Sequence, residues 1–298
     1  MRIRDVVDLL VLAALWGASF IFMRIAAPEL GPFVLGFLRA AIAALFLLPF
    51  MLLRAGITEL RRHWKKLALV GILNSAIPFF LLAFATLSLS GGFASIVNAT
   101  APLWAAVIAW IWFSEKLGGS RTVGLIIGFA GVVVLVWNKA GINFPGVFLA
   151  VLAAMSAAFF YGLGANFTKR YMQGINTLVV AAGSMVAAAI VLLPGAIVYW
   201  PGGPVSTQAW VAISIMGIAS TGIAYVLYFR LIVNVGPAKA ITVTYLVPGF
   251  AVIWGAMFID EKLTMNMIIG CAIILTGTAL ATGMLSLGRS SAASEDDA

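Results

Sequence analysis

The chain has little of the chemistry that soluble enzymes use. Its 298 residues include one cysteine, Cys271, and one histidine, His63. A lone cysteine excludes a disulfide framework or a thiolate metal cluster. A lone histidine leaves zinc chemistry and histidine-based acid–base catalysis without ligands or bases. We therefore expect no metal, no cofactor and no enzyme activity.

Charge is also scarce, because 9% of the residues are charged and 63% are hydrophobic. A soluble protein of this length exposes too much surface to carry so little charge. A transmembrane helix needs about 20 mainly apolar residues to cross a hydrocarbon core of roughly 30 Å. The sequence predicts an all-α integral membrane protein with ten transmembrane helices, near 5–27, 32–53, 66–88, 91–113, 121–138, 146–168, 175–198, 208–230, 237–259 and 265–286.

The basic residues are distributed unevenly between the two sides of this topology. One side holds 14 Lys and Arg and the other side holds three. The 14 lie in the N-terminus, in the even-numbered connections, among them the basic stretch 54–65, and in the segment after the tenth helix. The positive-inside rule places both termini in the cytoplasm. Because topology explains the basicity, we expect no nucleic acid partner. The polar tail 289–298 is expected to be disordered.

The tripeptide Glu-Lys-Leu occurs at 115–117 and again at 261–263. With an offset of 146, positions 94–131 align without a gap with 240–277, and ten of the 38 pairs are identical. We interpret residues 1–140 and 141–288 as two copies of a five-helix unit. Because five is odd, the second copy enters the bilayer from the opposite side, an inverted repeat that is common in secondary transporters.

These features together resemble a known superfamily. The chain is similar to the drug/metabolite transporter superfamily in its ten predicted helices and in four sequence features. These are Trp16-Gly17-Ala18-Ser19 in helix 1, Arg39 in helix 2, a proline in each of helices 4 and 9, and Glu-Lys-Leu after each of those two helices. More narrowly, it resembles the EamA-type members and the YddG-type aromatic amino-acid exporters. The resemblance implies a carrier in a bacterial-type inner membrane, working in the export direction, with a central cavity lined by helices 1, 3, 4, 6, 8 and 9.

Two prolines mark a candidate hinge. Pro102 and Pro248 lie mid-helix at equivalent positions of the repeat. A proline cannot donate to the carbonyl four residues earlier, so those of Asn98 and Thr244 are expected to be free. Paired broken helices point to a transporter site; simple packing kinks are the alternative.

Aromatic and small polar residues cluster at mid-depth of the cavity helices. Such a lining suits a neutral or zwitterionic small molecule with an apolar or aromatic side chain, such as an amino acid. Core packing is the alternative for each residue. The predicted cavity residues are Trp16, Ser19, Phe20, Met23, Asn74, Phe79, Leu82, Asn98, Tyr161, Asn166, Tyr225, Tyr228 and Thr244.

Charged residues near or inside the membrane are interpreted as structural. Arg39 lies about 10 Å into helix 2. It could bind a substrate carboxylate, but helix 2 does not line the cavity in the resembling fold, so we favour a structural role. Glu115, Lys116, Glu261 and Lys262 follow helices 4 and 9, where lysine complements the helix dipole; a gating role is the alternative.

The ten acidic residues map to membrane edges, loops and the tail. Without a carboxylate at mid-membrane, we expect gradient-driven uniport and no proton antiport of cationic drugs; sodium held by carbonyls is the alternative. Carriers of nucleotide-sugars, sugar phosphates or drug-like compounds, and a channel-like facilitator, are the other functions considered. Gly124, Gly128 and Gly131 favour internal packing, so we expect a monomer, with a dimer through this face as the alternative.

Overall fold

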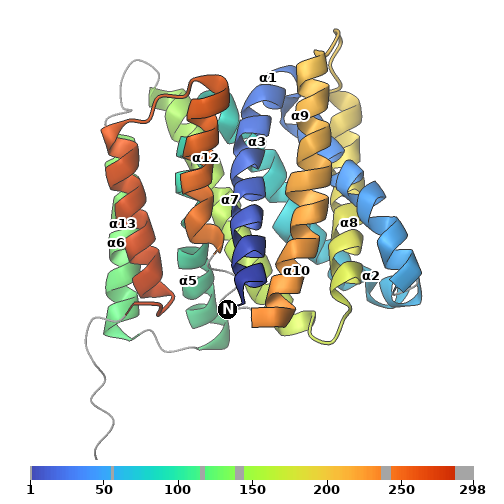
Figure 1. The fold of residues 1–298 in the computed structure, drawn as a ribbon, viewed down its shortest axis with the longest axis horizontal. Coiled ribbons are helices and arrows are strands. Elements are labelled where there is room, and N and C mark those ends of the chain that lie inside the picture. The colour runs from blue at the N-terminus through green and yellow to red at the C-terminus, as the bar shows by residue number, and fades with distance from the viewer. Residues whose placement is uncertain (1, 55–56, 115–117, 138–143, 236–242, 286–298) are drawn as a thin grey trace, which may run out of the picture.

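A computed structural model describes residues 2–54, 57–114, 118–137, 144–235 and 243–285. Over these ranges the chain is helical and has no β-strand, and the helices stand side by side as a bundle (Figure 1). The α-helices are α1 (Ile3–Arg54), α2 (Ile57–Gly71), α3 (Ile77–Ser88), α4 (Gly91–Asn98), α5 (Ala101–Phe113), α6 (Gly119–Trp137), α7 (Phe144–Tyr171), α8 (Thr177–Val198), α9 (Thr207–Gly217), α10 (Ala224–Val235), α12 (Val243–Ile259) and α13 (Met265–Ala281), with π-helices η1 (Ile72–Ala76) and η2 (Ile218–Ile223).

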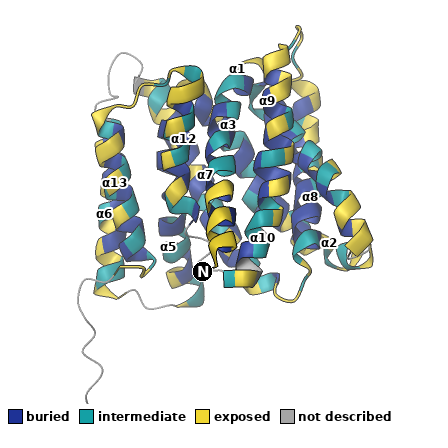
Figure 2. Ribbon diagram, viewed as in Figure 1, coloured by how far each residue is buried: buried dark blue, intermediate teal, exposed yellow. Residues whose placement is uncertain are grey.

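The outside of the bundle is apolar. Seven helical stretches of the described chain are long and apolar enough to cross a membrane, and α12 and α13 are shorter apolar helices. Large apolar side chains point outward, such as Ile111 (70% exposed) and Ile126 (67% exposed), and exposed residues follow the outer faces (Figure 2). Such a surface is unfavourable in water but suits lipid, where helices satisfy their own backbone groups. The predicted all-α integral membrane architecture is confirmed.

Helix α1 contains two of the predicted segments, 5–27 and 32–53. Gly31 has φ 71° and ψ 161°, which is not helical, so α1 consists of two helices joined at a kink. Pro28 and Pro32 flank the break and lack the N–H that would continue the hydrogen-bond ladder across it.

The predicted start of the third segment is wrong. We placed 54–65 in a connection, but α2 begins at Ile57. Leu60 and Leu67 of α2 pack close to Gly183 of α8, while basic side chains such as Arg62 remain exposed. An apolar stripe on one face is sufficient to keep this basic stretch helical.

The sequence repeat extends to the backbone. Helices α5 and α12 end at Phe113 and Ile259, which are 146 positions apart. The next residues, Ser114 and Asp260, have φ of 54° and 52°. Left-handed backbone is uncommon at residues other than glycine, so its occurrence at equivalent positions shows that both copies end this helix in the same way.

The equivalent helices α6 and α13 pack against each other (Figure 1). Gly124 faces Ala281, Gly131 faces Ile274, and Gly270 faces Leu135. Because the numbering rises along one helix as it falls along the other, the two helices run antiparallel. A Cβ on Gly124 would lie 2.4 Å from the backbone nitrogen of Ala281, so this face has no room for side chains. The prediction that this glycine stripe serves internal packing is confirmed.

A second pair of close contacts is reciprocal. Gly17 in α1 lies against Ala251 in α12, and Gly162 in α7 lies against Ala105 in α5. A Cβ on Gly17 would lie 2.9 Å from the nitrogen of Ala251, and one on Gly162 would lie 2.7 Å from the nitrogen of Ala105. The glycines correspond to each other in the repeat, and so do the alanines. Each half therefore uses the same two positions to contact the other.

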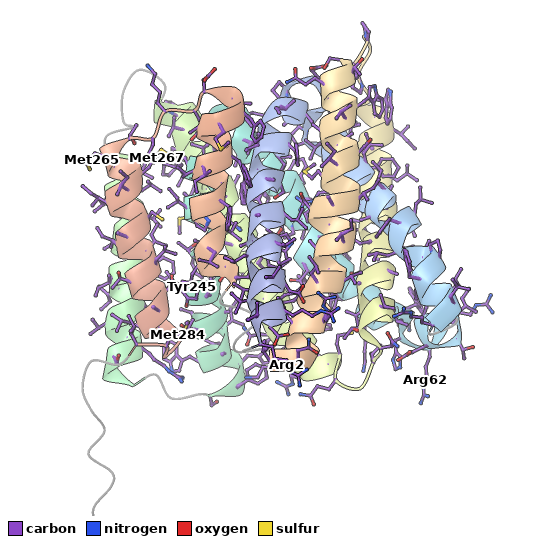
Figure 3. The ribbon with its side chains drawn as sticks, viewed as in Figure 1. Arg2, Arg62, Tyr245, Met265, Met267 and Met284 are labelled. Atoms are coloured by element: carbon purple, nitrogen blue, oxygen red, sulfur yellow. The ribbon has the colours of Figure 1, made fainter. Side chains whose placement is uncertain are left out.

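The ends of the bundle differ in what they carry. Arg2, Arg62 and Met284 lie at one end, and Met265 and Met267 lie at the opposite end (Figure 3). Arg2 of the N-terminal segment, Arg62 of α2 and Met284, shortly after α13, thus share one end.

We predict that Gly277→Ala destabilises the protein by about 1–3 kcal/mol, because overpacking a tight contact forces backbone shifts. A Cβ on Gly277 would lie 2.2 Å from the backbone nitrogen of Gly128. Gly249→Ala is the matched control, since no atom lies within 4 Å of its added Cβ. Thermal unfolding in one detergent should give a lower Tm for Gly277→Ala alone, and equal Tm values would contradict the packing described.

Candidate functional site

Two π-helices lie at equivalent positions of the repeat. Helices α2 and α9 end at Gly71 and Gly217, 146 positions apart, and η1 and η2 follow directly. Short π-helical segments inside α-helices are rare and are often found at functional sites. Each carries two adjacent polar residues, Asn74-Ser75 in η1 and Ser220-Thr221 in η2.

Within these polar pairs, Ser75, Ser220 and Thr221 are fully buried. The hydroxyl of Thr221 donates to the carbonyl of Met216, five residues earlier, at 3.0 Å. The hydroxyl of Ser220 has no hydrogen-bond partner among the described residues. Sequence reasoning predicted Asn74 and missed the other three; their signal was the alignment of the two polar pairs at the 146-residue offset.

Arg39 lies against η2 and is the centre of the polar cluster. Its guanidinium is buried, with 6% of the residue exposed. Nε donates to Oγ1 of Thr221 at 3.0 Å, and Nη1 lies 3.9 Å from Sδ of Met23. The guanidinium carbon sits 3.9 Å from the ring centroid of Phe79, in cation–π geometry. The structure thus brings three predicted residues together: Arg39, Met23 and Phe79.

No carboxylate of the described chain contacts Arg39. The side chains of Tyr161 and Tyr225 lie near the guanidinium of Arg39, and the Tyr225 hydroxyl lies beside Ser75. These tyrosines come from α7 and α10, so α1, α3, α7, α10 and both π-helices contribute to one cluster.

Three tyrosines of the bundle are partly accessible, because Tyr161, Tyr225 and Tyr228 are neither fully buried nor fully exposed. Tyr228 packs against Trp16, with ring centroids 5.4 Å apart. Trp16 is likewise partly accessible, so four of the predicted cavity residues keep part of their surface uncovered.

The predicted hinges differ from each other. The first copy breaks between α4 and α5 at residues 99 and 100, and Pro102 lies in the first turn of α5. Just before the break, Oδ1 of Asn98 is buried without a partner among the described residues. Pro248, in contrast, lies inside a continuous α12, and Thr244 lies half-buried in the first turn of that helix. The equivalent prolines thus have different local conformations.

Other predicted cavity residues make packing contacts. Asn166 donates to the carbonyls of Ala105 and Gly162, both at 2.9 Å, which ties α7 to α5. Ser19 donates to the carbonyl of Trp16 at 2.7 Å. Asn74 makes a long bond, 3.5 Å, to Thr168. Phe20 and Leu82 are buried in the apolar core.

Glu261, which follows α12, joins the two halves. The carboxylate of Glu261 accepts hydrogen bonds from the backbone nitrogens of Gly91, at 2.7 Å, and Gly92, at 3.1 Å. These amides belong to the first turn of α4, which has no intrahelical acceptors for them. Lys262 is exposed. Glu115 and Lys116 lie outside the described residues.

Further polar contacts join other segments of the bundle. Glu29 accepts from the backbone nitrogen and the hydroxyl of Ser206, both at 2.7 Å, and these bonds hold the pKa of Glu29 below its usual value. Near the N-terminus, Asp8 pairs with Arg230 of α10 through two hydrogen bonds. The hydrogen-bonded carboxylates of the described chain thus bind groups other than Arg39.

Comparison with known proteins identifies the fold and the class of activity. The model of the EamA-like transporter family matches the chain twice, at residues 6–137 and 148–283. This chain belongs to the EamA-like transporter family. It is therefore a membrane transporter of the drug/metabolite transporter superfamily, and the family is one of transporters, not enzymes.

Relatives of this EamA-like chain are similar over nearly their full length. The uncharacterized transporter YvbV of Bacillus subtilis is 22% identical over 286 residues, which cover 94% of this chain and 92% of YvbV. The uncharacterized inner membrane transporter YedA of Escherichia coli is 27% identical over 292 residues, 95% of this chain and 93% of YedA. A protein of known crystal structure, 21% identical, aligns with a TM-score of 0.67 over 95% of this chain and 99% of its own, and shares the fold.

We predict that Glu261→Ala destabilises the protein by about 1–3 kcal/mol, because it leaves two amides of α4 without acceptors. Glu261→Gln, which keeps one side-chain oxygen, should lose less. Lys262→Ala is the control, since this neighbour is exposed. Thermal unfolding of the purified variants in detergent measures the effect. A Tm for Glu261→Ala that matches the control would show that the contact does not stabilise the fold.

Proposed function

We propose that this chain is a secondary carrier that moves small neutral or zwitterionic metabolites across a bacterial-type cytoplasmic membrane by alternating access. The favoured substrates are amino acids with aromatic or other apolar side chains, and the favoured direction is export. The proposed topology has ten transmembrane helices, both termini in the cytoplasm and two inverted repeats, 1–140 and 141–288.

The antiparallel packing of α6 and α13 is the observation that carries this proposal. These helices are equivalent in the repeat, and their opposite directions support opposite orientations of the two copies. Inverted repeats let a carrier exchange the conformations of its halves about a site near the bilayer midplane. An inward-facing and an outward-facing state of similar energy then follow from one sequence.

Asymmetry in the structure supports such an exchange. The α4–α5 helix is broken at residues 99 and 100, while α12 continues past Pro248. A carrier that is open to one side of the membrane holds the equivalent segments of its two halves in different conformations. In the opposite state, the two halves would exchange these conformations.

Partly accessible aromatic residues support the proposed substrate class. Trp16, Tyr161, Tyr225 and Tyr228 offer flat apolar faces with polar edges, which suit an apolar side chain on a polar backbone. No carboxylate of the described residues contacts Arg39, and the proposal needs no proton exchange with a buried acid. Gradient-driven uniport is the simplest coupling.

We predict that the purified chain, reconstituted in liposomes loaded with unlabelled amino acid, accumulates the labelled amino acid transiently by counterflow. The panel is Phe, Tyr, Trp, Met and Thr, and empty liposomes are the control. Counterflow requires a binding site that reorients with substrate bound, so a carrier shows it and a channel does not. Saturable counterflow with at least one aromatic member is expected. Non-saturable flux without counterflow would favour a channel, and no flux of any member would contradict the amino-acid assignment.

A further inference from the structure

We infer that Arg39 is the binding residue for the carboxylate group of the transported substrate, so that the substrates are monocarboxylates such as amino acids. The inference rests on the proposed carrier function and deepens it. It also replaces the structural role that the sequence favoured for Arg39.

The first argument is the uncompensated charge of Arg39. Arginine stays protonated in proteins, and a buried charge is costly unless it is paired and hydrogen-bonded. Among the described residues, its contacts are a hydroxyl, a thioether and an aromatic face. Arg230, in contrast, has the carboxylate of Asp8, and Arg24 donates to the carbonyls of Thr86 and Leu87.

The second argument is the geometry of the free donors. Nε is held by Thr221 at 3.0 Å, and the plane is held against Phe79. The two terminal nitrogens have no oxygen acceptor among the described residues. A guanidinium fixed at Nε presents these nitrogens as a fork that matches the two oxygens of a carboxylate. The guanidinium is thus held at Nε and along its face, while its terminal nitrogens lack an oxygen partner among the described residues.

The third argument is the neighbourhood of the fork. Tyr161 lies near Arg39 and is partly accessible. Its phenol can donate a hydrogen bond to an anion. The neighbours of Arg39 thus include a donor for an anion, and no carboxylate of the described residues contacts the guanidinium. One cation fits one carboxylate, and a diphosphate would require more positive charge.

The fourth argument is that Arg39 has no counterpart in the second half. In the first two helices of each half the repeat has an offset of 145, which aligns Gly17 with Gly162. At this offset the equivalent of Arg39 is Ser184, whose hydroxyl donates to the carbonyl of Ala181 in its own helix at 2.9 Å. The packing contacts around these positions are repeated: Gly71 lies against Ala187, and Gly217 lies against Ile42. The helices thus pack in the same way in both halves although the second half has no arginine at this position, so packing does not require Arg39. A substrate with one carboxylate accounts for one arginine.

The test compares L-phenylalanine with L-phenylalaninamide, which lacks the carboxylate, as competitors of phenylalanine counterflow. The full-length chain should prefer the acid by about 10- to 100-fold, the range expected for hydrogen bonds to a charged group. In Arg39→Gln the preference should fall to about threefold or less, and Arg39→Lys should retain part of it. Arg24→Gln is the matched control and should keep the full preference. Binding of both probes to the purified variants in detergent gives the same ratio without transport.

The outcomes separate the inference from the proposed function. If the wild type transports phenylalanine but prefers the acid by less than about threefold, the inference is wrong and the carrier stands; this result needs no variant to fold. An unchanged preference in Arg39→Gln would overturn the inference equally. If the wild type carries no member of the amino-acid panel, the proposed function and the inference fail together.

Discussion

Close backbone contact between the two halves is the constraint on which the rest of the structure depends. In lipid, helices gain little from hydrophobic burial, so association relies on van der Waals packing between small residues. Here glycines of each half lie against backbone of the other: Gly17 on Ala251, Gly162 on Ala105, and Gly124 on Ala281. Each half supplies the same positions, so each of these contacts has an equivalent in the other half. The proposed exchange between two states of a carrier would use these equivalent contacts.

The polar cluster depends on this packing. The contact of Gly217 with Ile42 brings α9 against the second part of α1, next to Arg39. The π-helix η2 then follows directly and offers Thr221 to the guanidinium. The two halves of the scaffold are similar, but only the first half carries this arginine. A single cation in such a scaffold can hold a substrate in one orientation.

Much of the architecture could be predicted from the sequence. Apolar length located the spanning segments, since lipid leaves the backbone few options other than helix. The shared proline, glycines and Glu-Lys-Leu located the duplication, and the paired left-handed residues Ser114 and Asp260 show the same offset in the backbone. Periodicity missed the start of α2, because an amphipathic stretch rich in lysine and arginine has the composition of a loop.

The candidate site was less predictable, because it depends on contacts between distant segments. A π-helix shifts hydrogen bonds by one residue and leaves little signature in composition, so Ser75, Ser220 and Thr221 were missed. Asn166 has the polarity of a cavity residue, but its amide bonds the carbonyls of Ala105 and Gly162. The prediction for Arg39 rested on the helix that carries it, whereas in the structure its contacts come from α3, η2 and the first part of α1.

The most direct test of the inverted repeat is the sidedness of two equivalent residues. Ser114 and Asp260 are both exposed and follow α5 and α12. In a Cys271→Ser background, Ser114→Cys and Asp260→Cys are exposed singly to a membrane-impermeant maleimide on intact cells. The account predicts that Asp260→Cys reacts from outside and that Ser114→Cys reacts only after the membrane is opened. Reaction of both from the same side would contradict it.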